Sequence, residues 1–166
     1  MRRRLVAVCV LVSIGSSAAA ERLTRNASNA IRGEGSAIQL LIDRGMERSG
    51  TFRELAARLD GSDVTVYVRY SRCGGGVPAC LLWASAAGGV RRLLVKVDGV
   101  GRPQNDLIAL LAHELQHANE VASSPSIRDL ASFQEVFAAR GWRSGDGFET
   151  AEAKAITRRV TAELSR

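Results

Sequence analysis

The chain has 166 residues, of which 23 are lysine or arginine and 17 are aspartate or glutamate, giving a formal net charge of +6. This length suits one domain with one hydrophobic core. Three arginines lie among the first 20 residues, so the remainder carries 20 basic and 17 acidic side chains, a balance of +3. With 5% aromatic residues and no dense basic run after residue 20, the composition excludes the usual basic, aromatic-rich nucleic-acid-binding surface, and no nucleic-acid partner is expected.

The N-terminus has the pattern of a secretory signal. Residues 2–4 are arginines, residues 5–14 are an apolar stretch too short to cross a bilayer, and residues 17–20 offer small side chains for cleavage. We expect a signal peptide over residues 1–20 and a single domain over residues 21–166 of an exported protein, either periplasmic or secreted. No stable membrane span is expected after cleavage, and an uncleaved anchor is the alternative.

The cysteines point to the same compartment. Cys9 lies within the expected signal, which leaves Cys73 and Cys80 on either side of a Gly/Pro-containing loop. In an oxidising compartment, a lone pair around a short loop predicts a disulfide. A free thiol pair or a metal site is the alternative, although the spacing fits no standard zinc knuckle.

Two helices are predicted in the first part of the chain. Residues 21–33 are polar and irregular. Apolar side chains then recur at helical spacing over residues 36–47 and again over residues 51–59. Thr51 is the expected N-cap of the second helix, where Glu54 would complete a capping box.

Three strands are predicted next. Valines alternate with polar or aromatic residues over residues 64–70, and apolar runs follow at 81–84 and 90–97. The Gly88-Gly89 pair is a tight-turn signal between the second and third strands. Joined by short turns, the three strands predict a small antiparallel β-meander, with residues 90–97 as an edge strand that could hold a substrate backbone.

The motif His113-Glu114-Leu115-Gln116-His117 (HExxH) lies inside a predicted helix over residues 107–121 and contains both histidines of the chain. Residues four apart lie on one helix face, so His113 and His117 can converge on one metal ion, and Zn²⁺ suits imidazole nitrogen. Glu114 could reach a metal-bound water without being a ligand, which suits a general base. The alternative is an ordinary pair of surface histidines.

Two further helices are predicted after the motif. One runs over residues 127–140 with Ser126 as its cap, and the last runs from about residue 148 to residue 164. Helices, then a small sheet, then helices predict an α+β domain.

A third metal ligand is expected from the last helix. Glu149 continues its apolar stripe, whereas Glu152 lies on a more polar stripe and is expected to be solvated. Glu120 shares the histidine face but lies about 10 Å along the axis from His113, too far to share one metal ion with both histidines. The alternative for Glu149 is a capping box beginning at Asp146.

The HELQH motif on an amphipathic helix, followed by a helix beginning FETAEA (residues 148–153), resembles gluzincin-type HExxH zinc metallopeptidases. The resemblance covers about residues 90–160. It implies a zincin-like fold, with His113, His117 and Glu149 as zinc ligands and Glu114 as the base. Some members of this group have an aspartate four residues after the ligand glutamate, where this chain has Ala153. Asp129 is therefore the candidate for orienting a ligand histidine.

These features predict zinc-dependent hydrolysis of peptide bonds in a peptide or protein substrate. A catalytically inactive zinc module that binds peptides or envelope partners is the alternative, and an envelope domain with incidental histidines is a third. The sequence indicates neither the cleavage preference nor the oligomeric state.

Overall fold

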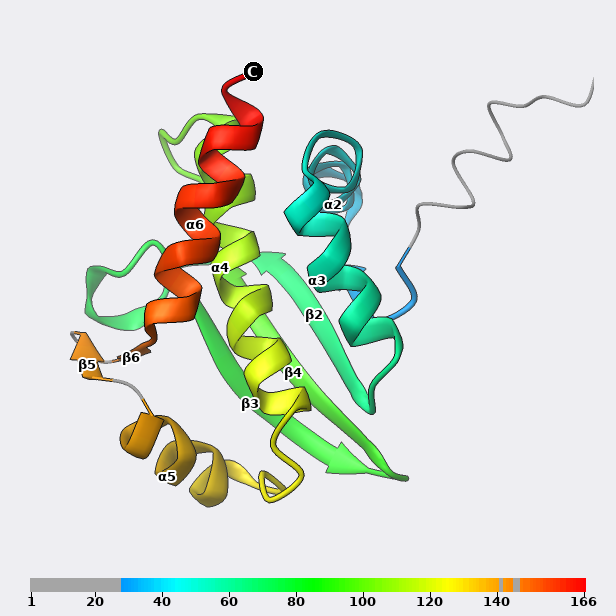
Figure 1. Cartoon of the computed structure of the whole chain (residues 1–166), viewed down its shortest axis with the longest axis vertical. Helices are drawn as coiled ribbons and strands as arrows, with labels where there is room; N and C mark the ends of the chain where they lie inside the picture. Colours follow the sequence, from blue (N-terminus) through cyan, green and yellow to red (C-terminus); the bar gives the residue numbers. More distant parts are fainter. Residues whose placement is uncertain (1–27, 141, 145–146) are drawn as a thin grey trace, which may run out of the picture.

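The computed structural model describes residues 28–140, 142–144 and 147–166 and confirms the α+β class (Figure 1). Helix α4 lies across one face of a four-stranded sheet, and α6 packs against α4. The elements are β1 (Ile31–Gly33), α2 (Ser36–Arg48), α3 (Gly50–Asp60), β2 (Val64–Tyr70), the short 3-10 helix η1 (Gly74–Gly76), β3 (Ala79–Ala87), β4 (Val90–Val97), α4 (Gln104–Ala122), α5 (Leu130–Arg140), β5 (Trp142–Ser144), β6 (Gly147–Glu149) and α6 (Ala151–Leu164).

The sheet is mixed, so the prediction of a purely antiparallel meander is wrong. Its strand order is β1-β2-β4-β3, with β2 parallel to both β1 and β4, and only β3 and β4 antiparallel. The inward residues of β2 and β4 are almost fully buried, whereas much of β3 is exposed. Strands that are buried by neighbours on both edges belong at the centre of a sheet, so β4 lies inside and β3 is the edge strand. The expectation that residues 90–97 form an edge is therefore also wrong.

Strand β1 was not predicted, because three residues are too few to show a periodicity. It is held at its start by Asp60, whose carboxylate accepts hydrogen bonds from the backbone N–H groups of Asn29 (2.9 Å) and Ala30 (2.8 Å). At its other end the backbone passes close to α2, where a Cβ atom on Gly33 would lie 2.9 Å from the Gln39 nitrogen. The absence of a side chain at Gly33 thus allows the strand to reach the sheet.

The core is built around α4, which is buried on more than one side. Leu107, Leu111 and Leu115 are buried as the helical period predicted, but Glu114 and His117 are buried too. The histidine side of the helix is therefore not an outer surface, because α6 and β3 also pack against α4. No described helix is both long and apolar enough to cross a bilayer. The predicted signal peptide, residues 1–20, lies outside the described residues.

The predicted disulfide is present. Cys73 and Cys80 are joined, with their Cα atoms 6.1 Å apart, across the connection between β2 and β3. The link closes the loop that contains η1, because it joins the residue just before η1 to the second residue of the edge strand.

Arg91, at the start of β4, joins the sheet to the end of α4. Its side chain is 3% exposed. It pairs with Asp63 just before β2, and its Nη1 atom donates to the carbonyl oxygens of Val121 (2.7 Å) and Ser124 (2.9 Å). Each of these carbonyls also accepts one backbone N–H, from Ser124 and Ile127, so the guanidinium is a second donor at the C-terminal end of α4 and just beyond it.

The first helices are fixed by a carboxylate from α6. The N-cap of α3 is Ser49 rather than Thr51, because the Ser49 hydroxyl accepts a hydrogen bond from the Phe52 backbone. The Thr51 hydroxyl instead donates to Glu163 (2.7 Å), which also binds the Ser49 hydroxyl and the Thr51 backbone N–H. Glu163 thereby connects α6 to the N-terminus of α3.

This contact predicts a pH-dependent part of the stability. Burial raises the pKa of Glu163, but hydrogen bonds from Ser49 and Thr51 outweigh it and hold the pKa below the ordinary 4.5. A lowered pKa contributes stability above the unfolded-state value and loses it as the pH falls through the folded-state value. We expect Glu163→Gln to be less stable by about 1 kcal/mol at neutral pH, with the difference vanishing at acid pH. Thermal unfolding between about pH 7 and about pH 3 measures this. The exposed Glu47→Gln is the control, and a constant difference at all pH values would contradict the assignment.

Candidate metal centre

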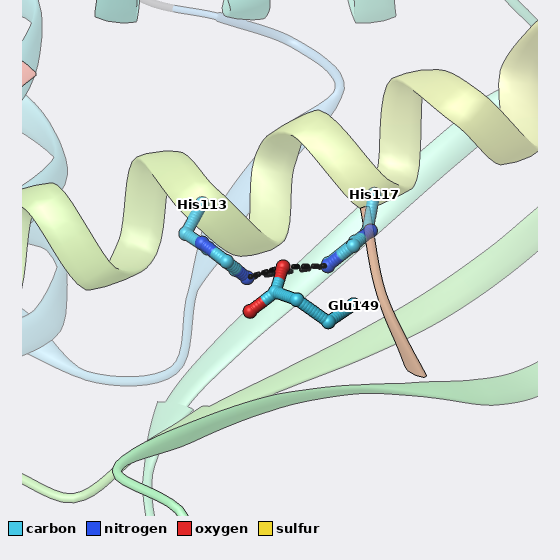
Figure 2. Close-up of side chains that lie close together, drawn as sticks. All are labelled: His113, His117 and Glu149. Atoms are coloured by element: carbon cyan, nitrogen blue, oxygen red, sulfur yellow. Dashed lines mark hydrogen bonds and ion pairs between the residues drawn. The ribbon is translucent and has the colours of Figure 1, made fainter. Parts of the chain in front are cut away.

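Three side chains from two parts of the chain converge beside α4. The Nε2 atoms of His113 and His117 are 3.2 Å apart, and Oε1 of Glu149 lies 3.3 Å from the first and 3.9 Å from the second. Figure 2 shows the two rings on successive turns of the helix, with the Glu149 carboxylate between their tips. One ligand atom from each residue lies within 4.8 Å of the others, so the three residues could hold a metal ion.

Both histidines are fixed in the form that leaves Nε2 free to bind a metal. The Thr157 hydroxyl donates to the Ala153 carbonyl, so it accepts a hydrogen bond from Nδ1 of His113 at 2.9 Å. Nδ1 of His117 donates to the Glu120 carboxylate, also at 2.9 Å, since a carboxylate only accepts. Each Nδ1 therefore carries a proton, and each Nε2 presents its lone pair.

The protonation tendencies of the two rings differ. Burial, and then the charge of His117, lower the pKa of His113. Burial is the largest single influence on His117 and disfavours its charged form, but the hydrogen bond to Glu120 and the charges of Glu114, Glu120 and Glu149 together outweigh it and raise the pKa of His117. Two lone pairs 3.2 Å apart repel unless a cation lies between them. A proton or a metal ion supplies that cation, and the Glu149 carboxylate adds the negative charge that a divalent ion prefers.

Glu149 reaches the site from a strand rather than from a helix. It is the last residue of β6, and Thr150 in extended conformation is the N-cap of α6. The capping-box alternative is thus wrong, because the helix begins after Glu149 and the Thr150 hydroxyl accepts from the Ala153 backbone. The Thr150 backbone N–H donates to Oε1 of Glu149 at 3.0 Å, which positions the carboxylate. Glu152, the other acidic candidate, is exposed as expected.

Asp129 does not orient a histidine, contrary to expectation. It lies at the start of α5, where its carboxylate accepts hydrogen bonds from the backbone and the hydroxyl of Ser132. This capping starts α5 at Leu130, three residues after the predicted start. The orienting groups are instead Thr157 and Glu120. Glu120 was rejected as a metal ligand by its distance from His113, yet its spacing of three residues from His117 suits a hydrogen bond. Nothing in the sequence singles out Thr157.

Glu114 lies next to the three convergent residues and is 6% exposed. Burial is the main cause that raises its pKa to about 7, and the charge of Glu149 adds to this. His117 and a backbone hydrogen bond at Leu81 act in the opposite direction. A carboxyl group with such a pKa can both take up and release a proton near neutral pH.

An open cleft of about 610 Å³ contains the whole group. Its lining comes from the edge strand β3 and from α4, α5 and α6. The histidines and Glu114 belong to this lining, together with aromatic side chains from α5 and cationic ones from α6. A ligand in the cleft would therefore contact the candidate metal group directly.

No protein-family model, no curated protein and no solved structure matches this chain. The resemblance to gluzincin-type peptidases therefore depends on the motif and on the residues of the site.

Proposed function

We propose that the protein is an exported enzyme that hydrolyses peptide bonds with the help of zinc. The observation that supports this most is the convergence of His113, His117 and Glu149 beside a buried Glu114 in an open cleft. Two imidazole nitrogens and one carboxylate are a donor set that zinc accepts in catalytic sites, where a fourth position stays open.

The residues have separate roles in this proposal. His113, His117 and Glu149 would hold the zinc, which would supply Lewis-acid chemistry for a bound water molecule and a peptide carbonyl. Glu114 accepts the proton of the attacking water and passes it to the leaving amine. The free edge of β3 offers backbone groups with which an extended substrate can pair.

Metal removal tests the proposal. We expect the purified protein to bind one zinc ion, to cleave a mixed pool of unstructured peptides, and to lose that activity in a chelator and regain it with zinc. Metal analysis and mass spectrometry of the products measure the two properties. A protein that binds no zinc contradicts the site, and a zinc-bound protein that cleaves no peptide contradicts the activity.

The second candidate is a zinc-stabilised module that binds peptides without cleaving them. The small size of the domain favours this alternative, since the described residues form one four-stranded sheet, one two-stranded sheet and the helices that pack with them. An inactive, zinc-bound protein that melts at a lower temperature after chelation would support it.

The orienting residue Glu120 gives a further prediction. Glu120→Ala removes the acceptor for Nδ1 of His117, so the ring loses its fixed tautomer and orientation. We expect zinc affinity to fall about 10- to 100-fold, as measured by competition with a chromophoric chelator. Glu152→Ala, an exposed glutamate two residues beyond Thr150, is the control and should bind zinc like the unmodified protein. Equal affinities for the two variants would remove Glu120 from the site.

A further inference from the structure

The cleft has two chemically different sides. The candidate metal group, which consists of His113, His117 and Glu149, lies between them. Chain order places β5 and β6 between α5 and α6, and Figure 1 shows the same arrangement in space. His117 contacts Phe137 of α5, and His113 contacts Thr157 of α6. A ligand that passes over the candidate metal group therefore has α5 on one side and α6 on the other.

The α5 side is a continuous aromatic surface. The ring of Phe137 lies 5.6 Å from that of His117, and the ring of Phe133 lies 4.9 Å from that of Phe137. Trp83, on the edge strand, continues the surface at 6.2 Å from Phe133. All three line the cleft. Phe137 is only 4% exposed, so the partly exposed Phe133 and Trp83 present most of the aromatic area to a ligand. These tilted rings beside a candidate ligand histidine favour a large apolar side chain next to the reacting bond.

The α6 side is cationic. Thr157 contacts His113, and Lys154 and Arg158 lie three residues before it and one residue after it, so all three share one side of the helix. Lys154 and Arg158 are exposed and line the cleft. Among the described residues, the acidic side chains that line the cleft are Glu114 and Glu149, which belong to the proposed catalytic group.

From this arrangement we infer that the preferred ligand is a peptide with a large apolar side chain on one side of the cleaved bond and a carboxylate on the other. The inference rests on the proposed function, since it concerns the same cleft. The apolar side chain lies against Phe133 and Trp83, and the carboxylate lies against Lys154 and Arg158. A carboxylate can come from an acidic side chain or from the C-terminus of a short peptide, and both present the same chemistry to an arginine.

Binding to a zinc-loaded Glu114→Gln protein tests the inference without cleavage. The probes are dye-labelled peptides of eight residues with a central phenylalanine, blocked at both ends. The first series has two peptides, with glutamate two residues before or two residues after the phenylalanine. The second series has glutamine at the same positions, and the third has lysine. A fourth peptide is the glutamine form with a free C-terminal carboxylate, and a fifth has serine in place of phenylalanine.

Fluorescence anisotropy gives the dissociation constants. We expect a carboxylate peptide to bind about tenfold more tightly than its glutamine counterpart, and the difference to shrink as salt is added. An advantage of the glutamate series assigns the carboxylate to a side chain, and an advantage of the free acid alone assigns it to a C-terminus. The serine peptide should bind about tenfold more weakly than its phenylalanine counterpart. No advantage for either carboxylate, or no binding of any peptide, overturns the inference.

Two double variants identify the side chains that bind the carboxylate. Lys154→Gln combined with Arg158→Gln should abolish the carboxylate preference, whereas Lys96→Gln combined with Arg92→Gln should retain it. The second pair removes the same charges from the outward side of β4, which lies on the opposite face of the sheet from α4. A preference that survives in the first pair places the carboxylate elsewhere and overturns the assignment.

The binding and cleavage experiments distinguish the proposed peptidase activity from the inferred ligand preference. If the protein binds the carboxylate peptides selectively but cleaves no peptide, the inferred ligand preference holds and the proposed peptidase activity is contradicted. If the unmodified protein cleaves peptides but shows no carboxylate preference in binding, the peptidase activity holds and the ligand preference is contradicted.

Discussion

Replacement of Glu114 by glutamine is expected to lower kcat for peptide hydrolysis by about 10²- to 10⁴-fold while the protein keeps its zinc. Glutamine has the shape of glutamate but cannot accept the proton of the attacking water. The fold should tolerate the change, because burial already raises the pKa of Glu114 to about 7 and the neutral form is therefore readily adopted. Steady-state kinetics on a cleaved peptide, with zinc content measured on the same sample, gives the result.

The control is Glu152→Gln, which removes one negative charge from an exposed position on α6. It should change kcat less than about twofold, since an exposed side chain outside the cleft contributes little to the site. Equal kcat values for Glu114→Gln and the unmodified protein would exclude a proton-transfer role for Glu114. Loss of zinc from Glu114→Gln would mean that this residue supports the ligands instead.

The second large effect concerns stability. Arg91→Ala is expected to lower the free energy of unfolding by about 1–3 kcal/mol, because it removes the hydrogen bonds of a buried guanidinium to the end of α4 and its pair with Asp63. The Asp63 carboxylate keeps Arg128 at 3.7 Å, and the Val121 and Ser124 carbonyls keep backbone partners, so the loss is smaller than for a fully buried ion pair. Urea unfolding followed by circular dichroism measures the change.

Arg92→Ala is the matched control, because it removes an arginine from the next position of β4. Its side chain points to the other face of the sheet, where its Nη1 atom contacts only the carbonyl of Ala87 at 3.3 Å among the described hydrogen bonds. A change within about 0.5 kcal/mol is expected. If the two variants were equally stable, the contacts of Arg91 with the end of α4 would have no net value.

Local patterns predicted the elements that have strong periodicity. Strand β4 begins and ends where alternation predicts it, and β2 begins at Val64 and ends at Tyr70 as predicted. The HExxH helix was also predicted, because its apolar side chains recur over about four turns. Its first turn was missed, since Pro103 provides no side-chain cap that could be recognised.

Strand order could not be predicted in the same way. Short turns favour neighbours in sequence as neighbours in the sheet, but β4 lies between β2 and β3. The deciding factor is how completely each strand is buried, which depends on the helices that pack above it. Local polar contacts caused the other errors. Asp129 and Thr150 bind backbone groups and shift the starts of α5 and α6.

The three residues predicted as metal ligands lie together, whereas the residue predicted to orient a histidine lies elsewhere. His113, His117 and Glu149 do converge, although Glu149 belongs to a strand. The residues that orient the histidines were missed, because one of them, Thr157, is 44 positions from its partner in the sequence. Such contacts depend on how α6 crosses α4, and no pattern within one helix records that crossing.

Thr150 gives the site an order of assembly. Its hydroxyl donates to Glu120 at 2.8 Å and accepts from α6, while its backbone N–H holds Glu149. Docking of α6 on α4 therefore brings Glu149 to the histidines and gives Glu120, the partner of His117, a hydrogen bond from Thr150. During synthesis the helix that carries His113 and His117 leaves the ribosome before residues 149–157 do, so the nascent chain has both histidines without Glu149 or Thr157. The candidate metal centre is therefore complete only after the later part of the chain has been made.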